Sequence, residues 1–422
     1  MRWIYNLIFL PLGALFIRFA SLVDSKSRRW LAGRRNLFPT LEANIAKLRP
    51  GAKRIWFHSS SMGEFEQAKP MIAELKKRRP DVEVIVSFFS PSGYDHSQRY
   101  KHASVVTYIP LDTAANAERF VRDLSPAAAV LVRYDVWPNH LRALKTAGVP
   151  AFIANATLSK STPRSWPLLY GFHRDVYNSL DYILTVSESD KEAFESFRLS
   201  HPVIEVIGDT RFDQVLQRHA EAQTRNLIPD SFLSDKQFLV IGSSWEEDLN
   251  VLVSAIGRLL SENSRLGVIV VPHEPNEETL ERIEQQFAPH ARTLRFSSIN
   301  DHHNERCVIV DSIGILTTLY KYARVAYVGG SFRQGVHNVL EPAVFGVPVV
   351  VGPRHENSQE AKQLIALGGA FTIADEDSAY ERLRILFSDE TLRAKAGHVA
   401  CEYVHKNAGA TEKFLTYLEK VI

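Results

Sequence analysis

Residues 54–60 read RIWFHSS, a short apolar run that ends in polar residues. Runs of this kind recur along the first half of the chain and alternate with amphipathic stretches such as AKPMIAELKKRR. The others are VEVIVSFFS (82–90), ASVVTYIPL (103–111), AAAVLVRY (127–134), AFIANATLS (151–159), DYILTVS (181–187) and VIEVIGDT (203–210). Apolar runs of this length between helical patterns are typical of parallel strands that are buried on both faces. The pattern therefore predicts a doubly wound α/β domain.

A second series of apolar runs begins at residue 237. Its members are QFLVIGSS (237–244), LGVIVVP (266–272), RCVIVD (306–311), RVAYVGGS (324–331), VPVVVGP (347–353) and AFTIAD (370–375). Between the two series, residues 214–236 carry charge, glutamine and proline without a strand pattern, so they are predicted to form a linker. A chain of 422 residues also suits two domains of ordinary size. We expect two Rossmann-like domains that face a central cleft, over residues 26–213 and 237–422.

Composition excludes several classes of function. Hydrophobic residues make up 45% of the chain and charged residues 23%, which is typical of a folded globular protein. The formal net charge of +2 is too small for the basic field that nucleic-acid binding requires, so no nucleic-acid partner is expected. Cys307 and Cys401 form neither a disulfide framework nor a metal-binding pair, and His302 and His303 lack further ligands at metal spacing. No metal site is predicted.

The amino-terminal residues differ from the rest of the chain. Residues 3–23 read WIYNLIFLPLGALFIRFASLV, an apolar stretch that is close to the length of a membrane span. The positive-inside rule assigns to the cytoplasmic side the basic residues that follow, which are Lys26, Arg28, Arg29, Arg34 and Arg35. We predict a membrane-anchoring helix over residues 1–25 that either spans the bilayer or lies on its surface. A buried core helix is the alternative.

A polar turn follows the first predicted strand, at the end of the sheet where open α/β folds bind ligands. It reads His58-Ser59-Ser60-Ser61-Met62-Gly63-Glu64 and ends in an acid at the start of a helix. A carboxylate at this position either stabilises the helix N-terminus or acts as a general base on an acceptor hydroxyl. The polar residues around Glu64 favour the general base.

Glycines end a strand of the second half at Gly329-Gly330-Ser331, and residues 337–342 then read HNVLEP. The backbone N–H groups of the glycines and the following helix N-terminus are predicted to bind an anion. Glu341 is predicted to accept hydrogen bonds from both hydroxyls of a ribose. The alternative is that the glycines only permit close packing. Neither half has GxGxxG after its first strand and GxxxxGK[ST] is absent, so dinucleotide and P-loop cradles are unsupported.

Two further strand ends carry candidate ligand-binding residues. Val271-Pro272-His273-Glu274 forms a turn after one strand of the second half, and Arg211 lies in GDTRFD (208–213) after the last strand of the first half. The Arg211 guanidinium is predicted to form a bidentate interaction with a phosphate or a sugar carboxylate. An ordinary salt-bridged arginine is the alternative.

Taken together and in this order, these segments resemble the 3-deoxy-D-manno-octulosonic acid (Kdo) transferase family. The resemblance spans nearly the whole chain and also includes DVWPN (135–139), IANATLS (153–159) and VVGPRHEN (350–357). It implies a GT-B glycosyltransferase that takes Kdo from CMP-Kdo with inversion at the anomeric centre. It further implies that the acceptor is a lipid A precursor, lipid IVA, in lipopolysaccharide core biosynthesis at the cytoplasmic face of the inner membrane. Neither a metal nor a cofactor is implied.

The resemblance also implies roles for individual residues. Glu64 matches the catalytic base of the family, and Arg211 stands where a lysine commonly assists the transition state. The implied CMP contacts are Pro272, His273, Ile313, Gly314, Ile315, Asn338, Val339, Leu340 and Glu341.

The chain departs from the family pattern at two positions. His273 replaces an arginine, so a permanent cation becomes a titratable group. We expect either that the donor phosphate is bound more weakly or that Arg211 or Arg333 binds it. Arg133-Tyr134-Asp135 stands where the family has E-T-E, so a cation replaces an acid that assists catalysis. Either Asp135 takes over the role of that acid or the site is ordered differently, and we include Arg133 and Asp135 among the candidate catalytic residues.

Two other functions remain open. The H-N-x-x-E-P segment also resembles GT-B transferases and sugar-nucleotide epimerases that use a UDP-sugar. A membrane-tethered scaffold with a degenerate transferase fold is the third possibility, and the presence of Glu64, Asn338 and Glu341 argues against it.

Overall fold

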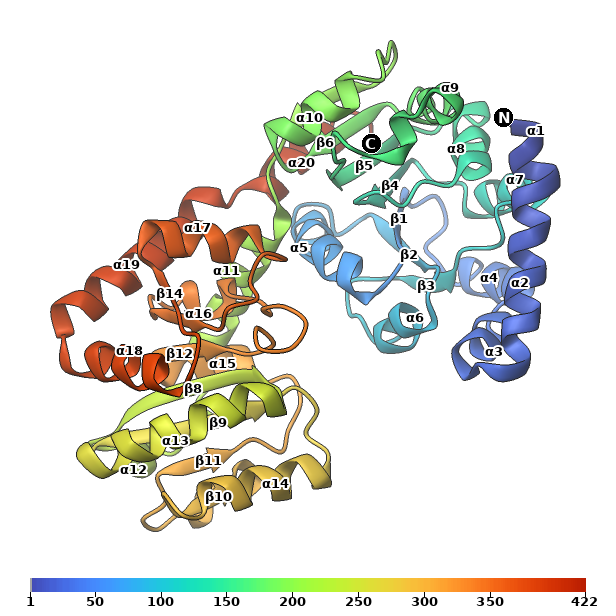
Figure 1. The fold of residues 1–422 in the computed structure, drawn as a ribbon. Helices are drawn as coiled ribbons and strands as arrows, with labels where there is room; N and C mark the ends of the chain where they lie inside the picture. The colour runs from blue at the N-terminus through green and yellow to red at the C-terminus, as the bar shows by residue number, and fades with distance from the viewer. Residues whose placement is uncertain (1) are drawn as a thin grey trace. The chain divides into compact units, whose positions relative to one another are not determined.

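The computed structural model describes residues 2–422, which form two compact units (Figure 1). Unit 1 extends to Gln214 and also contains Ala408–Ile422, whereas unit 2 is Val215–Asn407. Met1, the first residue of the predicted anchor, lies outside the described residues. Each unit is built on one parallel sheet that is covered by helices, which confirms the prediction of two Rossmann-like α/β folds.

The sheet of unit 1 has the strand order β3-β2-β1-β4-β5-β6-β7. Its strands are β1 (Arg54–Ser59), β2 (Glu83–Phe88), β3 (Val105–Tyr108), β4 (Ala128–Val132), β5 (Ala151–Ala156), β6 (Tyr182–Thr185) and β7 (Val203–Val206). The helices of this unit between the strands are α5 (Met62–Arg78), α6 (Pro91–Ser97), α7 (Ala114–Leu124), α8 (Pro138–Thr146), η2 (Pro163–Ser165), α9 (Pro167–Tyr177) and α10 (Glu188–Glu195). Since β1 and β4 are neighbours from which the chain proceeds toward opposite edges, their carboxyl ends form the switch point where such sheets bind ligands.

The sheet of unit 2 has the order β10-β11-β9-β8-β12-β13-β14. Its strands are β8 (Gln237–Ser244), β9 (Leu266–Pro272), β10 (Thr293–Arg295), β11 (Cys307–Ile309), β12 (Ala323–Val328), β13 (Val349–Val351) and β14 (Ala370–Thr372). Its helices are α12 (Asp230–Leu233), α13 (Glu246–Glu262), α14 (Glu277–Phe287), η3 (Phe296–Asp301), α15 (Leu316–Leu319), η4 (Tyr320–Tyr322), α16 (Leu340–Ala343), α17 (Gln359–Leu367), α18 (Glu376–Ser388) and α19 (Glu390–Asn407). The edge strand β10 was not among the predicted strands.

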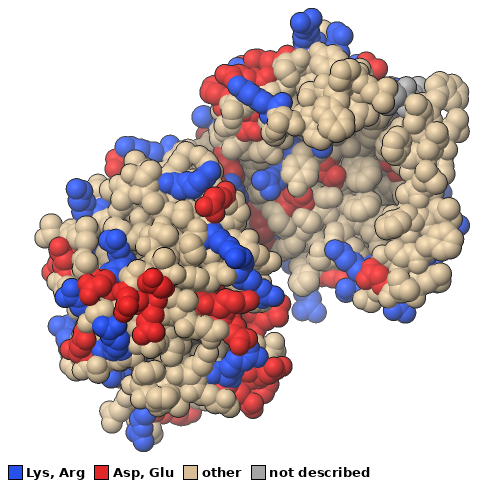
Figure 2. Space-filling model, viewed as in Figure 1, with Lys and Arg blue, Asp and Glu red and all other residues tan. Residues whose placement is uncertain are grey.

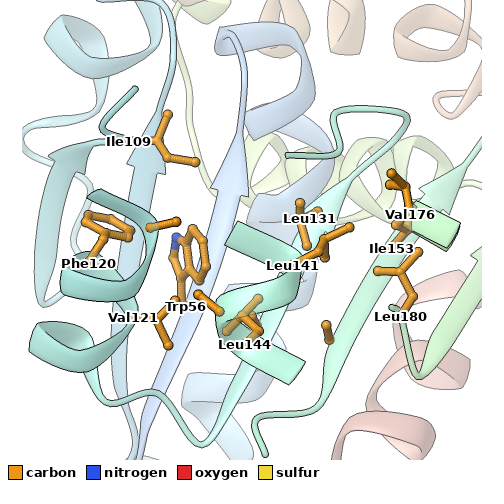
Figure 3. Close-up of a cluster of buried hydrophobic side chains, with 14 of the residues drawn as sticks. Trp56, Ile109, Phe120, Val121, Leu131, Leu141, Leu144, Ile153, Val176 and Leu180 are labelled. Atoms are coloured by element: carbon orange, nitrogen blue, oxygen red, sulfur yellow. The ribbon is translucent and has the colours of Figure 1, made fainter. Parts of the chain in front are cut away.

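The core of unit 1 lies on both faces of its sheet because successive strand residues point to opposite sides. Trp56 of β1 packs on one face among residues of α7 and α8, with its ring centroid 5.3 Å from that of Phe120 (Figure 3). The next residue, Phe57, packs on the other face with the apolar side chains of α5. All three aromatic side chains are almost completely buried.

The boundaries of the units differ from the predicted ones in two places. Residues 214–236 contain most of α11 (Thr210–Gln223) and all of α12, and the boundary between the units falls within α11. The segment is not a bare linker because Val215, Ile228 and Phe232 are buried. The C-terminal helix α20 (Ala410–Leu418) belongs to unit 1, since Phe414 packs with its ring centroid 6.2 Å from that of Phe57.

The amino-terminal segment is helical, as predicted. It comprises α1 (Arg2–Ile4), η1 (Tyr5–Phe9), α2 (Leu10–Val23), α3 (Ser25–Ala32) and α4 (Leu37–Ile45). Residues Tyr5–Val23 form a helical stretch of 19 residues with a mean hydropathy of 1.9, which by length and composition is sufficient to cross a membrane. None of the 18-residue window of this stretch that has this mean hydropathy is buried, so the alternative of a buried core helix is wrong. In Figure 2 this stretch gives the largely tan edge of unit 1 at the right of the view.

Arg34, one of the basic residues predicted to lie on the cytoplasmic side, packs against unit 1. The Arg34 guanidinium lies 3.7 Å from the Trp30 ring centroid and 4.7 Å from that of Tyr108, and it donates hydrogen bonds to the carbonyl oxygens of Phe89 and Ile109. Burial lowers the pKa of Arg34 to about 9. Arg34 therefore holds the start of α4 against the sheet of unit 1.

Candidate active site

The turn after β1 holds the predicted base. Glu64 is the third residue of α5 and is only 7% exposed. Its Oε2 accepts hydrogen bonds from the backbone N–H of Ser61 at 2.6 Å and from the Ser61 hydroxyl at 2.5 Å, which forms a capping box. Oε1 accepts no hydrogen bond within residues 2–422. Both interpretations of Glu64 are therefore compatible with the geometry, because one oxygen caps the helix and the other is left for a proton.

A second carboxylate stands at the end of β4. Oδ2 of Asp135 lies 2.8 Å from Nε2 of His58 and 3.2 Å from the indole nitrogen of Trp137. Burial by itself would raise the pKa of Asp135, but hydrogen bonds from His58, Ser60 and Trp137 outweigh it and the pKa lies below its ordinary value. Asp135 is therefore ionised at neutral pH.

The two carboxylates are held by neighbouring residues of one turn. Ser60 donates to Asp135, and Ser61 donates to Glu64. The structure thus brings these two predicted catalytic residues to the same edge of the unit 1 sheet.

Arg133 occupies a strained backbone position between β4 and Asp135. Its φ of 67° is left-handed, which is costly for a residue with a Cβ. The guanidinium lies 5.8 Å from the Tyr134 ring centroid, and no carboxylate of the described chain forms an ion pair with it. The left-handed residue thus places a cation just after the end of β4.

Arg211 forms the salt bridge that the alternative interpretation predicted. Its Nε and Nη2 lie 2.8 Å and 2.7 Å from Oδ2 of Asp209, which is itself buried. The preceding residue, Thr210, accepts a hydrogen bond of 2.5 Å from Asn155 and donates one of 2.7 Å to the carbonyl of Gln67. These buried contacts attach the start of α11 to α5, so Arg211 and Glu64 lie on helices that are fixed to each other.

The donor-site residues predicted in unit 2 are only partly brought together. A cavity of about 440 Å³ within unit 2 is lined by Gly314, Asn338 and Glu341, as well as by other residues of this unit. Glu341 accepts hydrogen bonds from Arg218 at 3.0 Å, from Thr317 at 3.0 Å and from Asn338 at 3.3 Å. The carboxylate is therefore oriented into the cavity by three donors.

The other predicted CMP contacts do not line this cavity. Val339 and Leu340 are 1% exposed, so their side chains belong to the core, whereas the Ile313 side chain is 86% exposed. Pro272 ends β9 with its side chain buried, and Ile315 precedes α15. Their roles in donor binding remain predictions.

His273 lies in an aromatic cluster with Trp245 and His337. Its ring centroid is 4.4 Å from that of Trp245 and 4.6 Å from that of His337, and both pairs are stacked. Burial, together with the nearby His273, lowers the pKa of His337. Arg333 lies 4.0 Å from the Trp245 ring centroid. His273, which stands where the family pattern has arginine, is thus part of a cluster that also contains the permanent cation Arg333.

The predicted anion site at the glycines is occupied by the protein itself. The backbone N–H of Gly330 donates to Oδ2 of Asp248 at 2.8 Å. A Cβ on Gly329 would lie 2.3 Å from the carbonyl oxygen of Ser243, and one on Gly330 would lie 2.4 Å from that of Gly335. These contacts support the alternative that the glycines permit close packing.

Several residues of the unit 2 cavity were not predicted. They are Arg218, Glu221, Ala222, Arg225, Ser243, Leu316, Thr317, Thr318, Tyr320, Val328 and His337. Arg218 and Ala222 are four residues apart on α11, which is the spacing of one helical face, and Arg225 lies just beyond the end of that helix. That spacing was the available signal, although it lay in the segment predicted as a linker.

Comparison with known proteins shows similarity to one family of transferases. A family described as "3-Deoxy-D-manno-octulosonic-acid transferase (kdotransferase)" matches residues 32–214. The 3-deoxy-D-manno-octulosonic acid transferase of Haemophilus influenzae is 23% identical over 431 residues, with coverage of 99% of this chain and 98% of that protein. The protein of the same name from Bordetella pertussis is 27% identical over 383 residues, with coverage of 88% of each. The chain is therefore similar to Kdo transferases over most of its length, and the family match lies in its first half.

A solved structure of another enzyme is similar to this chain in fold. The UDP-GlcNAc 2-epimerase from Neisseria meningitidis, solved with UDP-GlcNAc, has a TM-score of 0.59 and 14% identity. The likeness covers 87% of this chain and 100% of the epimerase. At this identity it shows a shared fold alone, which agrees with the predicted GT-B architecture.

Proposed function

We propose that this protein transfers Kdo from CMP-Kdo to a lipid A precursor, such as lipid IVA, in lipopolysaccharide core biosynthesis. The observation that carries the proposal is the full-length match to Kdo transferases, together with a carboxylate at the predicted position of the base. An epimerase or another transferase that uses a UDP-sugar is less well supported, since the epimerase likeness concerns the fold alone.

Glu64 is the proposed general base. An oxygen of the acceptor hydroxyl bonds to the anomeric carbon of Kdo, and its proton passes to Oε1 of Glu64. The bond between that carbon and the phosphate oxygen breaks, and CMP leaves with the electron pair. Because Ser61 holds Oε2, the base is oriented without a further rearrangement of its side chain.

Asp135 and Arg211 are the proposed helpers of this step. Positive charge develops on the sugar as the leaving group departs, and the ionised Asp135 stabilises it. The Arg211 guanidinium is 38% exposed, and its permanent positive charge suits it to a phosphate or to the Kdo carboxylate. We assign Arg133 the same role as Arg211, the binding of negative charge on the donor, since Arg133 is a cation without a carboxylate partner in the described chain.

The unit 2 cavity is the proposed site of the CMP moiety. Glu341 is suited to accept hydrogen bonds from the ribose hydroxyls, and the nearby Arg218 and Arg225 offer positive charge to the phosphate. Pro272, His273, Ile313, Gly314, Ile315 and the segment 338–340 keep their proposed donor contacts on the basis of the family resemblance.

The proposed location is the cytoplasmic face of the inner membrane, where a lipid acceptor is available. The exposed apolar helix Tyr5–Val23 supports membrane association by its length and composition. No group of three or more potential metal ligands occurs in residues 2–422, and a reaction without metal or cofactor stays a prediction.

An assay of CMP release tests the proposal. The detergent-solubilised protein is incubated with CMP-Kdo and a tetra-acylated lipid A precursor, and the product is identified by mass spectrometry. We expect CMP release that depends on the acceptor, and a lipid product that is heavier by whole Kdo units. A folded protein that releases no CMP contradicts the proposal, and conversion of a UDP-sugar instead supports the alternative.

A further inference from the structure

His58 is the histidine of the turn that carries the base, yet its side chain points into the interior of unit 1. Its side chain is completely buried at the end of β1. Both ring nitrogens have partners, because Nδ1 lies 2.8 Å from Oγ of Ser87 and Nε2 lies 2.8 Å from Oδ2 of Asp135. Its role must therefore be exerted through Asp135.

The partners of Ser87 determine where the imidazole proton lies. The indole N–H of Trp56 can only donate, and it donates to Oγ of Ser87 at 2.8 Å. The Ser87 hydroxyl then has one proton to donate, and Nδ1 of His58 is the one side-chain acceptor in the described chain within hydrogen-bonding distance. Nδ1 is therefore unprotonated in the neutral ring, and the proton is on Nε2.

We propose that Trp56 and Ser87 select the Nε2–H tautomer of His58, which makes His58 the residue that positions Asp135 for Kdo transfer. This inference rests on the proposed function, since Asp135 is a catalytic residue only in that reaction. The indole N–H of Trp137 lies within hydrogen-bonding distance of two acceptors, Nε2 of His58 at 3.0 Å and Oδ2 of Asp135 at 3.2 Å. A protonated Nε2 cannot accept a hydrogen bond, so in the Nε2–H tautomer the indole donates to Asp135. Two N–H groups thus converge on Oδ2.

In the Nε2–H tautomer the imidazole orients the carboxylate without cancelling its charge. An imidazolium beside Asp135 would form an ion pair and reduce the negative potential that a developing cation on the sugar requires. The other titratable or charged groups around Asp135 are Tyr5 of η1, Arg133 at the end of β4, and Glu64 through the neighbouring serines. Since Arg133 replaces the usual acid, Asp135 is the carboxylate that remains at the end of β4.

Two substitutions of His58 separate positioning from packing. In His58→Gln the new amide nitrogen reaches the position of Nε2, whereas in His58→Asn it reaches only the position of Nδ1. We expect His58→Gln to retain kcat within about tenfold and His58→Asn to lose about 100-fold, with little change in the KM for CMP-Kdo. Equal losses in both variants, with intact folds, would overturn the proposal.

The pH profile gives a readout that a packing role would not change. The donors to Asp135 lower its pKa, so their loss in His58→Asn raises that pKa and protonates the carboxylate at higher pH. Because the ionised form is required, the acidic limb of the kcat profile should move to higher pH in His58→Asn and stay in place in His58→Gln. An unchanged acidic limb in His58→Asn would contradict the assignment.

Nuclear magnetic resonance tests the tautomer without any assay of activity. In the full chain labelled with ¹⁵N-histidine, the His58 signals should report a protonated Nε2 and an unprotonated Nδ1, and Ser87→Ala should abolish that preference. Ser97→Ala is the matched control, since Ser97 is 1% exposed and donates to the sulfur of Met62 on α5 instead. A protonated Nδ1 in the unsubstituted protein would refute the inference even if Kdo transfer is observed, and the expected tautomer would stand even if it is not.

Discussion

At the scale of single residues, Glu64 combines a structural and a chemical role. Oε2 caps α5 through Ser61, while Oε1 is left for the acceptor proton. A capping box accepts glutamine as well as glutamate at this position, so the two roles can be separated by substitution.

We expect Glu64→Gln to lower kcat by about 10²–10⁴-fold, because the amide can cap the helix but cannot take up a proton. The melting temperature should stay close to that of the unsubstituted protein. Ser61→Ala is the control with the opposite pattern, since it costs about 1 kcal/mol of stability and keeps the Glu64 carboxylate, to which the backbone N–H of residue 61 still donates. CMP release and thermal unfolding measure the two effects, and near-normal turnover in Glu64→Gln would remove Glu64 as the base.

A second residue-scale prediction concerns Arg218, which donates to Glu341 at the edge of the unit 2 cavity. Arg218→Met should weaken CMP binding by about tenfold, since it removes a charged donor from Glu341 and a cation from the cavity. Arg258→Met is the control, because Arg258 pairs with Asp377 and does not line the cavity. Isothermal titration calorimetry with CMP distinguishes them, and equal affinities for both variants would exclude Arg218 from the donor site.

At the scale of elements, the strands were predictable and some partners of the helices were not. A run such as RIWFHSS identifies β1 because a strand buried on both faces is apolar throughout. The helix that carries Arg218 was missed because charge, glutamine and Pro229 obscure its spacing in the predicted linker.

Contacts between distant residues set the limit of prediction. His58 and Asp135 are 77 residues apart, and they meet only because β1 and β4 are neighbours in the sheet. In the same way, an amphipathic pattern shows that α20 has an apolar face without showing which sheet that face covers. The base could be found from its local strand-turn-helix pattern, whereas its surroundings depend on the order of strands.

The element-scale prediction is that α20 stabilises unit 1. Phe414 is completely buried against Phe57 and Phe152. Phe414→Ala should lower the free energy of unfolding by about 3–5 kcal/mol, because it removes a large buried side chain and leaves a cavity. Lys413→Ala, at an exposed position of the same helix, should change it by less than about 0.5 kcal/mol. Urea denaturation compares them, and equal stabilities would show that α20 is dispensable for unit 1.

At the scale of the whole molecule, the apolar helix is attached to unit 1 by specific polar contacts. The Tyr5 hydroxyl donates to Oδ2 of the buried Asp112 at 2.7 Å, and Asn139 donates to Asn6 at 2.7 Å. Asp112 also accepts hydrogen bonds from the backbone of Asn139 and His140 at the start of α8. The two polar residues near the start of the apolar stretch thus fix it to the body of unit 1.

The corresponding prediction concerns binding to membranes. The Phe16 and Phe19 side chains are 72% and 63% exposed, so replacing both by glutamate should greatly reduce co-sedimentation with anionic phospholipid vesicles. Leu367→Glu is the control, since Leu367 is an exposed apolar residue of unit 2 at 57%. CMP binding should persist in both variants. Vesicle binding that is unaffected by the double substitution would contradict the role of this helix.

Because unit 2 is inserted into unit 1, the order of synthesis imposes an order of assembly. The ribosome completes Val215–Asn407 before it makes Ala408–Ile422, so unit 2 has all its residues while unit 1 still lacks α20. During this interval Phe57 and Phe152 are without the side chains that cover them in the finished fold. A nascent chain halted after residue 407 should therefore expose apolar surface on unit 1 and become a substrate for chaperones, whereas a chain that includes Ala408–Ile422 should not.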